Sequence, residues 1–196
     1  MPRYVDHEAQ KAQIAEAVLT VMARDGLEQV TMRKIAAELG STTGLLTHYF
    51  GDREALIAHA LDLQDCRLFD DLSAVAVDAV DGRDALRRTL QRLCLFADAV
   101  SGSVFFLRLA AAPKSGAMGE RSRRMYRRFE RIVQARIESA AADGSLVLGL
   151  SLRDATDSLV AAADGIYSCV IARPRRFPPG RRLELIDIAI KGIEMR

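Results

Sequence analysis

The stretch STTGLLTHYF, residues 41–50, gathers side chains that can form hydrogen bonds without carrying a negative charge. On a helix, Leu46 and Phe50 fall on the inward side. The outward side then presents Thr43, Gly44, Leu45, Thr47, His48 and Tyr49. A narrow helix with hydroxyl groups and no carboxylate on its outer face suits the major groove of DNA, where base edges offer hydrogen-bonding groups and thymine offers a methyl group. The stretch therefore predicts a DNA recognition helix.

The residues around this stretch predict the elements that position it. Met32, Ile35, Ala36 and Leu39 recur on one helical face. Thr31 is a favoured N-cap residue for that helix, and Thr42 and Asp52 can cap the next two. Gly40 stands where the first helix must end in a left-handed conformation. Two short helices around a turn, followed by a third, predict a helix-turn-helix.

Residues 31–57 resemble the DNA-binding segment of the TetR family of bacterial transcriptional repressors. The family pattern reads roughly T-x-x-x-I-A-x-x-x-G-V-S-x-G-x-L-Y-x-Y-F-x-x-K-x-x-L. The matches are Thr31, Ile35, Ala36, Gly40, Gly44, Leu46, Tyr49, Phe50 and Leu56, with Arg53 in place of the lysine. Ser41 departs from the usual turn valine and Thr47 from the common tyrosine, and the second change predicts an altered base preference. The resemblance implies a dimeric repressor that a small molecule releases from a palindromic operator.

The expected DNA contacts follow from this pattern and resemblance. They are Thr31, Arg33, Thr42, Thr43, Gly44, Leu45, Thr47, His48, Tyr49 and Arg53. We expect Thr43, Leu45, Thr47 and His48 to approach bases, and Arg33, Tyr49 and Arg53 to meet phosphates. His48 has no serine, cysteine or carboxylate placed in sequence to make it a catalytic base.

The composition is that of an ordinary globular protein, with 49% hydrophobic and 28% charged residues and a net charge of +2. No signal peptide or long apolar run is present, and Cys66, Cys94 and Cys169 form no C-x-x-C pair. These features predict a cytoplasmic protein without disulfides or zinc. No nucleophile-base, paired-carboxylate or metal-ligand constellation emerges, so we expect neither an enzyme nor a cofactor. A helical enzyme, or a protein-interaction dimer that does not bind DNA, remains the alternative.

Only helical periodicity occurs along the chain, which predicts an all-α fold of about nine helices. Residues 1–55 are expected to form a three-helix DNA-binding bundle, and residues 56–196 a larger domain for ligand binding and dimerisation. Asp164-Gly165-Ile166 and Arg173-Pro174 are similar to the C-terminal regions of a TetR subgroup related to choline-responsive regulators of betaine synthesis. The absence of tryptophan, the best residue for a quaternary-ammonium cage, disfavours choline itself as the effector.

Two further sets of residues are predicted in the C-terminal region. The candidate walls of a ligand pocket are Phe69, Phe96, Phe106, Tyr126, Phe129 and Tyr167, and plain core packing is the alternative for each. The broad apolar arcs of the last two helices predict a dimer interface at Leu159, Ala163, Ile166, Val170, Ile186, Ile190 and Ile193. The arginine-rich stretch from Arg121 to Arg131 is either a solvated helix face or a contact for an anionic ligand, an acidic partner or a DNA backbone.

Overall fold

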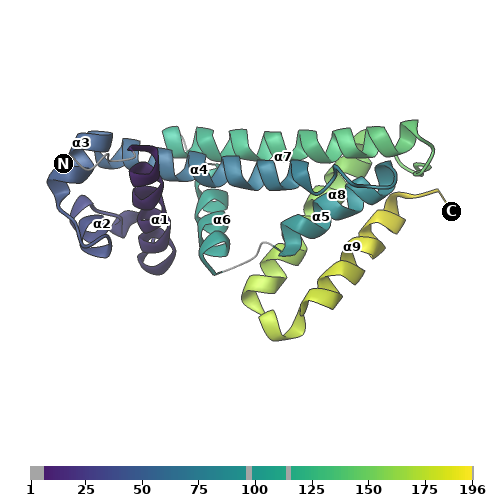
Figure 1. The fold of residues 1–196 in the computed structure, drawn as a ribbon. Helices are drawn as coiled ribbons and strands as arrows, with labels where there is room; N and C mark the ends of the chain where they lie inside the picture. Colours follow the sequence, from purple (N-terminus) through teal and green to yellow (C-terminus); the bar gives the residue numbers. More distant parts are fainter. Residues whose placement is uncertain (1–6, 96–98, 114–115, 196) are drawn as a thin grey trace. The chain divides into compact units, whose positions relative to one another are not determined.

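The computed structural model describes residues 7–95, 99–113 and 116–195, and every regular element in these ranges is helical. Figure 1 labels the α-helices. The elements in chain order are α1 (His7–Asp25), η1 (Leu27–Gln29), α2 (Met32–Glu38), α3 (Thr43–Phe50), α4 (Arg53–Ala74), α5 (Gly82–Leu95), α6 (Ala99–Ala111), α7 (Ala117–Ala142), α8 (Leu152–Ala172), η2 (Pro174–Arg176) and α9 (Pro179–Ile193). The prediction of an all-α fold with about nine helices is confirmed.

The chain folds as two compact units. The first comprises Met1–Leu68 and Ala99–Gly119, and the second comprises Phe69–Asp98 and Glu120–Arg196. The first unit thus adds α6 to the predicted helix-turn-helix bundle, a feature that the sequence analysis did not anticipate. The functional boundary near residue 55 stays a prediction, because it concerns which residues bind DNA.

The core of the first unit forms where the apolar stripes of α1, α2, α3 and α4 meet. Ile14, Ile35, Leu46 and Leu61 are all fully buried there. Helix α6 packs against α1 and contributes Val104 to the same core. Burial of these stripes holds the short helices α2 and α3 in place, because helices of seven or eight residues are not stable alone.

A buried ion pair fastens α6 to α4 within the first unit. Arg108 is only 3% exposed, and its Nη2 donates a hydrogen bond to Asp65 Oδ2 at 2.8 Å, while Nη1 contacts the other carboxylate oxygen. A bidentate arginine-carboxylate pair fixes both distance and orientation. Removing either partner would leave a buried charge uncompensated, so the pair must stay formed in the folded unit. Its fixed geometry therefore sets how α6 lies on α4.

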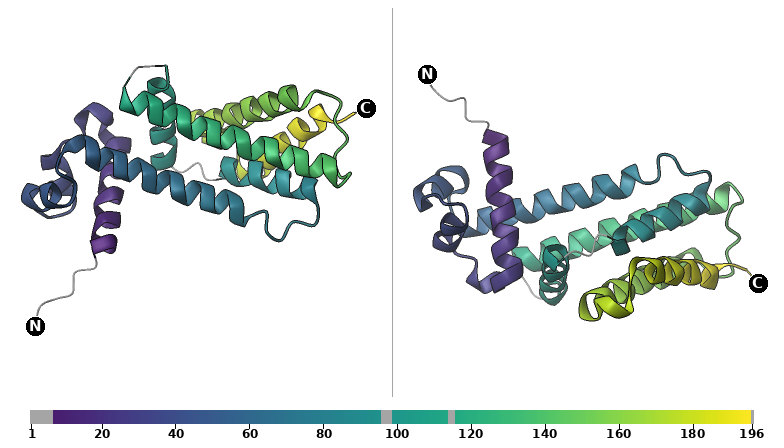
Figure 2. Two further views of the ribbon diagram at one scale, coloured as in Figure 1. Left: turned by 90° about the horizontal axis from the view of Figure 1, so that it is seen from above. Right: turned by 60° about the horizontal axis from the view of Figure 1, so that its bottom comes forward.

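In the second unit, α8 and α9 run side by side and both pack against α5 (Figure 2). Ser151 caps α8 as predicted, because its Oγ accepts from the Asp154 amide at 3.1 Å and donates to Asp154 Oδ2 at 2.6 Å. Helix α8 is the one described helix long and apolar enough to cross a membrane, and 44% of its most apolar window is buried within the chain. That burial is typical of a core helix.

The start of α5 lies very close to the end of α7. A Cβ atom on Gly82 would stand 2.5 Å from Ala140 Cα, so only glycine fits at this position. The Gly82 amide donates to Asp143 Oδ2 at 2.6 Å, and the Arg83 amide donates to Ser145 Oγ at 2.9 Å. These bonds satisfy two of the free amides at the N-terminus of α5 and hold it against α7.

Candidate nucleic-acid interface

Helices α2 and α3 begin at the threonines that the sequence predicts as caps. Thr31 has extended backbone angles, and its side chain accepts a hydrogen bond from the Lys34 amide at 3.2 Å. Thr42 does the same for the Leu45 amide at 3.3 Å. Each cap satisfies one of the free amides of a helix N-terminus, a contribution worth about 1 kcal/mol. The two capping predictions are confirmed.

The turn between the two helices depends on Gly40. Its φ of +60° lies in the left-handed region, as predicted, and residues with side chains adopt that conformation at a cost. The next amide, Ser41 N, donates back to the carbonyl of Ala36 at 2.8 Å. This backward bond closes the end of α2 and sets the direction in which α3 starts.

The outer face of α3 is available for contact. Leu46 is fully buried, whereas Thr43, Gly44, Thr47 and His48 are exposed and Leu45 is half-buried. Thr47 Oγ1 donates to the Thr43 carbonyl at 3.0 Å, which spends its hydroxyl proton and leaves the oxygen as an acceptor. Described residues of this face therefore offer hydroxyls, an imidazole and part of a leucine side chain, with no carboxylate among them.

Aromatic rings support one end of this face. The ring of Tyr49, which is half-buried, lies 5.4 Å from that of His48 and 5.6 Å from that of His7, measured between centroids. The same tyrosine packs against the core of the first unit. These contacts limit the freedom of Tyr49 and His48 and leave the His48 ring exposed. Contact of either side chain with DNA stays a prediction.

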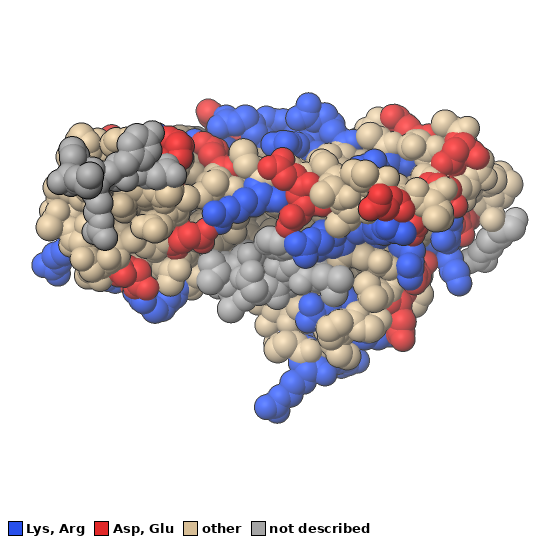
Figure 3. Space-filling model, viewed as in Figure 1, with Lys and Arg blue, Asp and Glu red and all other residues tan. Residues whose placement is uncertain are grey.

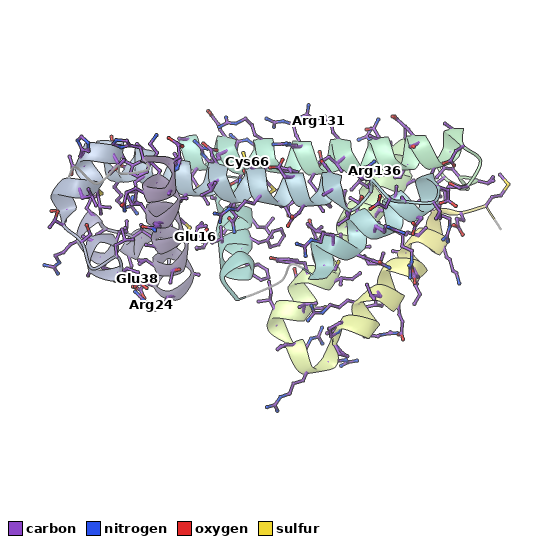
Figure 4. The ribbon with its side chains drawn as sticks, viewed as in Figure 1. Glu16, Arg24, Glu38, Cys66, Arg131 and Arg136 are labelled. Carbon is purple, nitrogen blue, oxygen red and sulfur yellow. The ribbon has the colours of Figure 1, made fainter. Side chains whose placement is uncertain are left out.

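The basic residues near α2 differ in how far they are neutralised. Lys34 Nζ lies 3.2 Å from Asp25 Oδ2. Arg24 forms ion pairs with both Asp25 and Glu38, and Figure 4 shows Arg24 and Glu38 close together. The hydrogen bond from Arg24 holds the pKa of Asp25 below its ordinary value. Arg33 is exposed and has no ion-pair partner among the described residues. It is therefore the cation of α2 best suited to meet a phosphate.

Arg53, predicted to contact phosphate, has a different set of partners in the structure. Its Nη2 donates to the Leu27 carbonyl at 2.7 Å, its Nε to the Val30 carbonyl, and its Nη1 to Glu54 at 3.2 Å. The guanidinium thus ties the segment before α2 to the start of α4, and a phosphate would have to compete with these acceptors. The forked donors of arginine can hold two carbonyls at once.

Replacing Arg53 with alanine should therefore destabilise the first unit. Loss of hydrogen bonds to two carbonyls should lower the free energy of unfolding by about 1–3 kcal/mol. Urea titration followed by circular dichroism measures the change, with Arg53→Lys as the matched variant that keeps the charge and one donor group. Equal stability of the parent and Arg53→Ala would show that these contacts are not structural and would restore phosphate binding as the main role.

The six predicted pocket residues do not all fall in one unit. Phe69, Phe129 and Tyr167 are buried in the second unit, and Tyr126 is half-buried there. Phe106 belongs to the first unit and is 36% exposed, and Phe96 lies outside the described residues. Asp164 belongs to the Asp164-Gly165-Ile166 step but not to the predicted pocket residues, and its Oδ2 accepts a hydrogen bond from Tyr126 Oη at 3.0 Å.

The seven predicted dimer residues are buried in the interior of a single chain. Leu159, Ala163, Ile166, Val170, Ile186, Ile190 and Ile193 are each at most 7% exposed, where α8 and α9 pack together. A side chain already buried in its own chain has little surface left for a second copy. The exposed faces of the same helices carry other residues, with Ile188 of α9 at 58% exposure.

The basic face of α7 stands out in Figure 3, where Lys and Arg atoms gather along this helix. Parts of it are engaged, since Arg128 lies 4.0 Å above the Phe69 ring and Arg131 Nε donates to the Arg127 carbonyl at 3.1 Å. Arg131 points away from α7 in Figure 4. A second basic region surrounds η2, where Arg173, Pro174, Arg175 and Arg176 line a shallow hollow of about 380 Å³.

Comparisons with known proteins agree with this geometry. Residues 14–60 match the model for bacterial regulatory proteins of the tetR family, and residues 82–193 match that for the C-terminal region of BetI-type transcriptional repressors. The HTH-type transcriptional regulator PksA of Bacillus subtilis is 39% identical over 77 residues, which are 39% of this chain and 38% of PksA. The regulator BetI of Paraburkholderia phymatum is 33% identical over 57 residues, or 29% of either chain.

Solved structures extend the similarity over the whole fold. A transcriptional regulator from Saccharomonospora viridis, crystallised in complex with choline, superposes with a TM-score of 0.85 at 19% identity and covers 96% of this chain and 100% of its own. At that identity the likeness shows the fold alone, whereas the second family model spans more than half of the chain. The chain belongs to the TetR family of bacterial regulatory proteins and has a C-terminal region of the BetI type.

Proposed function

We propose that the chain is a cytoplasmic one-component transcriptional repressor. As a homodimer it binds a palindromic operator, and a small molecule bound in the C-terminal region releases it. The observation that carries this proposal is the outer face of α3, which is exposed, capped at its start by Thr42, rich in hydroxyls and free of carboxylates. Regulator names among the relatives support a binding protein over an enzyme.

The exposure of each side chain on α2 and α3 indicates whether it would contact bases or phosphates. Thr43 and Thr47 present hydroxyl oxygens to base edges, and the outward part of Leu45 fits a thymine methyl. Arg33 and the N-termini of α2 and α3 face phosphates, which fix register without reading sequence. One such helix contacts few bases, so specific binding needs two copies related by two-fold symmetry.

The dimer face that we propose lies on the sides of α8 and α9 that point away from their shared core. On α8 these positions carry small residues at four-residue spacing, Ala161 and Gly165, which let a second helix approach closely. On α9 the same side carries Ile188, the most exposed isoleucine described, beside the half-buried Leu185. A two-fold partner covering this face would bury apolar surface that water otherwise meets.

Effector binding would act by shifting a population. The ligand binds more tightly to a conformation of the dimer in which the spacing between the two copies of α3 does not fit the operator. Operator affinity then falls, and the ratio of the ligand's affinities for the two conformations limits the size of the fall. The Saccharomonospora viridis protein binds choline, which supports a small effector of that size for the C-terminal region of this chain. The buried aromatics Phe129 and Tyr167 and the half-buried Tyr126 are the residues that we propose to lie near it.

Selection of bound duplexes from a random DNA library by the purified full chain tests the repressor proposal. We expect enrichment of one palindrome whose half-sites lie about one helical turn, roughly 34 Å, apart. Footprinting should then show protection on both half-sites, and a promoter carrying the site should be repressed by the chain. Recovery of no preferred sequence would contradict the proposal and favour the protein-interaction alternative.

A further inference from the structure

The carboxylate of Asp164 lies within the second unit and forms no ion pair with any of the described residues. It is half-buried on α8, and the Tyr126 hydroxyl of α7 is the one side-chain group that donates a hydrogen bond to it among the described residues. A carboxylate can accept about four hydrogen bonds, so the Tyr126 hydroxyl satisfies only part of its capacity. No lysine, arginine or histidine among the described residues forms an ion pair with it.

The charges around this carboxylate make its position less favourable. Burial raises the pKa of Asp164, the Tyr126 hydrogen bond opposes that rise, and the like charge of Glu130 adds to it. From α5, Cys94 is fully buried, and burial raises the pKa of its thiol to about 12, with the charge of Asp164 contributing. Arg182 of α9 is occupied by the Phe177 carbonyl at 2.8 Å.

A partly buried charge without a counterion costs stability, and groups of this kind cluster at functional sites. Here the carboxylate accepts a hydrogen bond from Tyr126 of α7, and Asp164 is one helical turn before Tyr167 on α8. Both Asp164 and Tyr126 keep part of their surface exposed, so a small molecule can reach them. A cation with hydrogen-bond donors would complement this group of residues.

We propose that Asp164, with Tyr126 beside it, binds the protonated nitrogen of an effector that is a primary or secondary amine. That the bound amine acts as the effector of a repressor rests on the proposed function. An ammonium group with N–H bonds can donate to the open lone pairs of the carboxylate in charge-assisted hydrogen bonds. A quaternary ammonium has no such donor and depends on aromatic faces, of which tryptophan is the best, and the chain has none.

Thermal unfolding of the full chain at pH 7.5 with small probes tests the assignment. The probes are 2-phenylethylamine and n-hexylamine, with 2-phenylethanol, n-hexanol and choline chloride as comparisons at equal ionic strength. Either amine should raise the Tm by several degrees, whereas the alcohols and choline should leave it near that of the free protein. Equal shifts with amines and alcohols, a larger shift with choline, or no shift with either amine would overturn the proposal.

Two matched variants separate a ligand contact from a structural one. Asp164→Asn should weaken amine binding at least about tenfold by calorimetry, because it removes the charge and keeps the shape. Asp157→Asn removes an exposed carboxylate from the same helix and should bind amines like the parent. Unchanged amine affinity in Asp164→Asn would overturn the assignment.

A ligand-free comparison gives an independent readout. Without amine, Asp164→Asn should unfold at a higher temperature than the parent at pH 7.5, because an uncompensated charge has been removed. The difference should shrink on acidification, since the destabilisation by a carboxyl whose folded pKa is raised is complete above that pKa and is lost as the pH falls to the pKa of the unfolded chain. A lower Tm for Asp164→Asn would mark Asp164 as a structural partner of Tyr126 and overturn the proposal. None of these measurements uses DNA, so they stand apart from any failure of operator binding.

Discussion

Replacing Thr43 with aspartate should abolish operator binding while the chain stays folded. Thr43 is the first residue of α3, is exposed, and follows the Thr42 cap. A carboxylate there interacts favourably with the helix dipole, so the helix should not lose stability. On DNA the same carboxylate would face bases and phosphates and would be repelled. We expect operator affinity to fall at least about 100-fold, equivalent to about 2.7 kcal/mol.

Fluorescence anisotropy on the selected operator measures this loss, and circular dichroism checks the fold. Gln13→Glu is the matched control, because it adds the same charge to an exposed position of α1 in the same unit. Its effect should be small and should vanish at higher salt, since separated exposed charges are screened. If both variants weaken binding equally, the effect is one of net charge; if Thr43→Asp binds like the parent, α3 does not read the DNA.

The helix-turn-helix could be predicted from sequence because its determinants are local. A capping threonine acts on an amide three residues away, as Thr31 and Thr42 do, and a left-handed turn needs a glycine such as Gly40. Each of these signals is read within one turn of helix and does not depend on the rest of the fold. The same holds for Ser151 at the start of α8.

What could not be predicted depends on contacts between distant residues. Arg53 bonds to carbonyls more than 20 positions earlier, and Tyr126 meets Asp164 across 38 positions. No periodicity encodes either contact, so Arg53 was predicted to contact phosphate and Asp164 was not singled out for chemistry. The placement of α6 with α1 is of the same kind, because an apolar helix fits many partners equally well.

The apolar arcs of α8 and α9 show how one sequence pattern can fit two different neighbours. Their width was interpreted as surface for a second chain, yet α8 and α9 pack on each other and both pack on α5. Three helices in mutual contact need two apolar stripes on each member, which accounts for the burial of Ile186, Ile190 and Leu159 in one chain. The surface left for a partner is therefore smaller, and Ile188 is its largest exposed apolar side chain on these two helices.

Replacing Ile188 with aspartate should convert the homodimer into monomers. A charge in the middle of an apolar helix interface must be desolvated for the dimer to form, which costs free energy that burying the isoleucine does not. Because Ile188 is 58% exposed in the single chain, the substitution should leave the monomer folded, unlike a change at the buried Ile186 or Ile190. Sedimentation velocity at micromolar concentration measures the change in mass.

Val147→Asp is the matched control, because Val147 has the same 58% exposure in the second unit and lies in the connection between α7 and α8. It should remain dimeric and bind operator like the parent. Ile188→Asp should lose at least about 100-fold in operator affinity although α3 is unchanged, since a monomer occupies one half-site with half of the phosphate contacts. A parent protein that sediments as a monomer, or an Ile188→Asp variant that stays dimeric, would place the interface elsewhere. If a substitution in α9 abolishes both dimerisation and operator binding, then specificity depends on the pairing of two recognition helices and not on one alone.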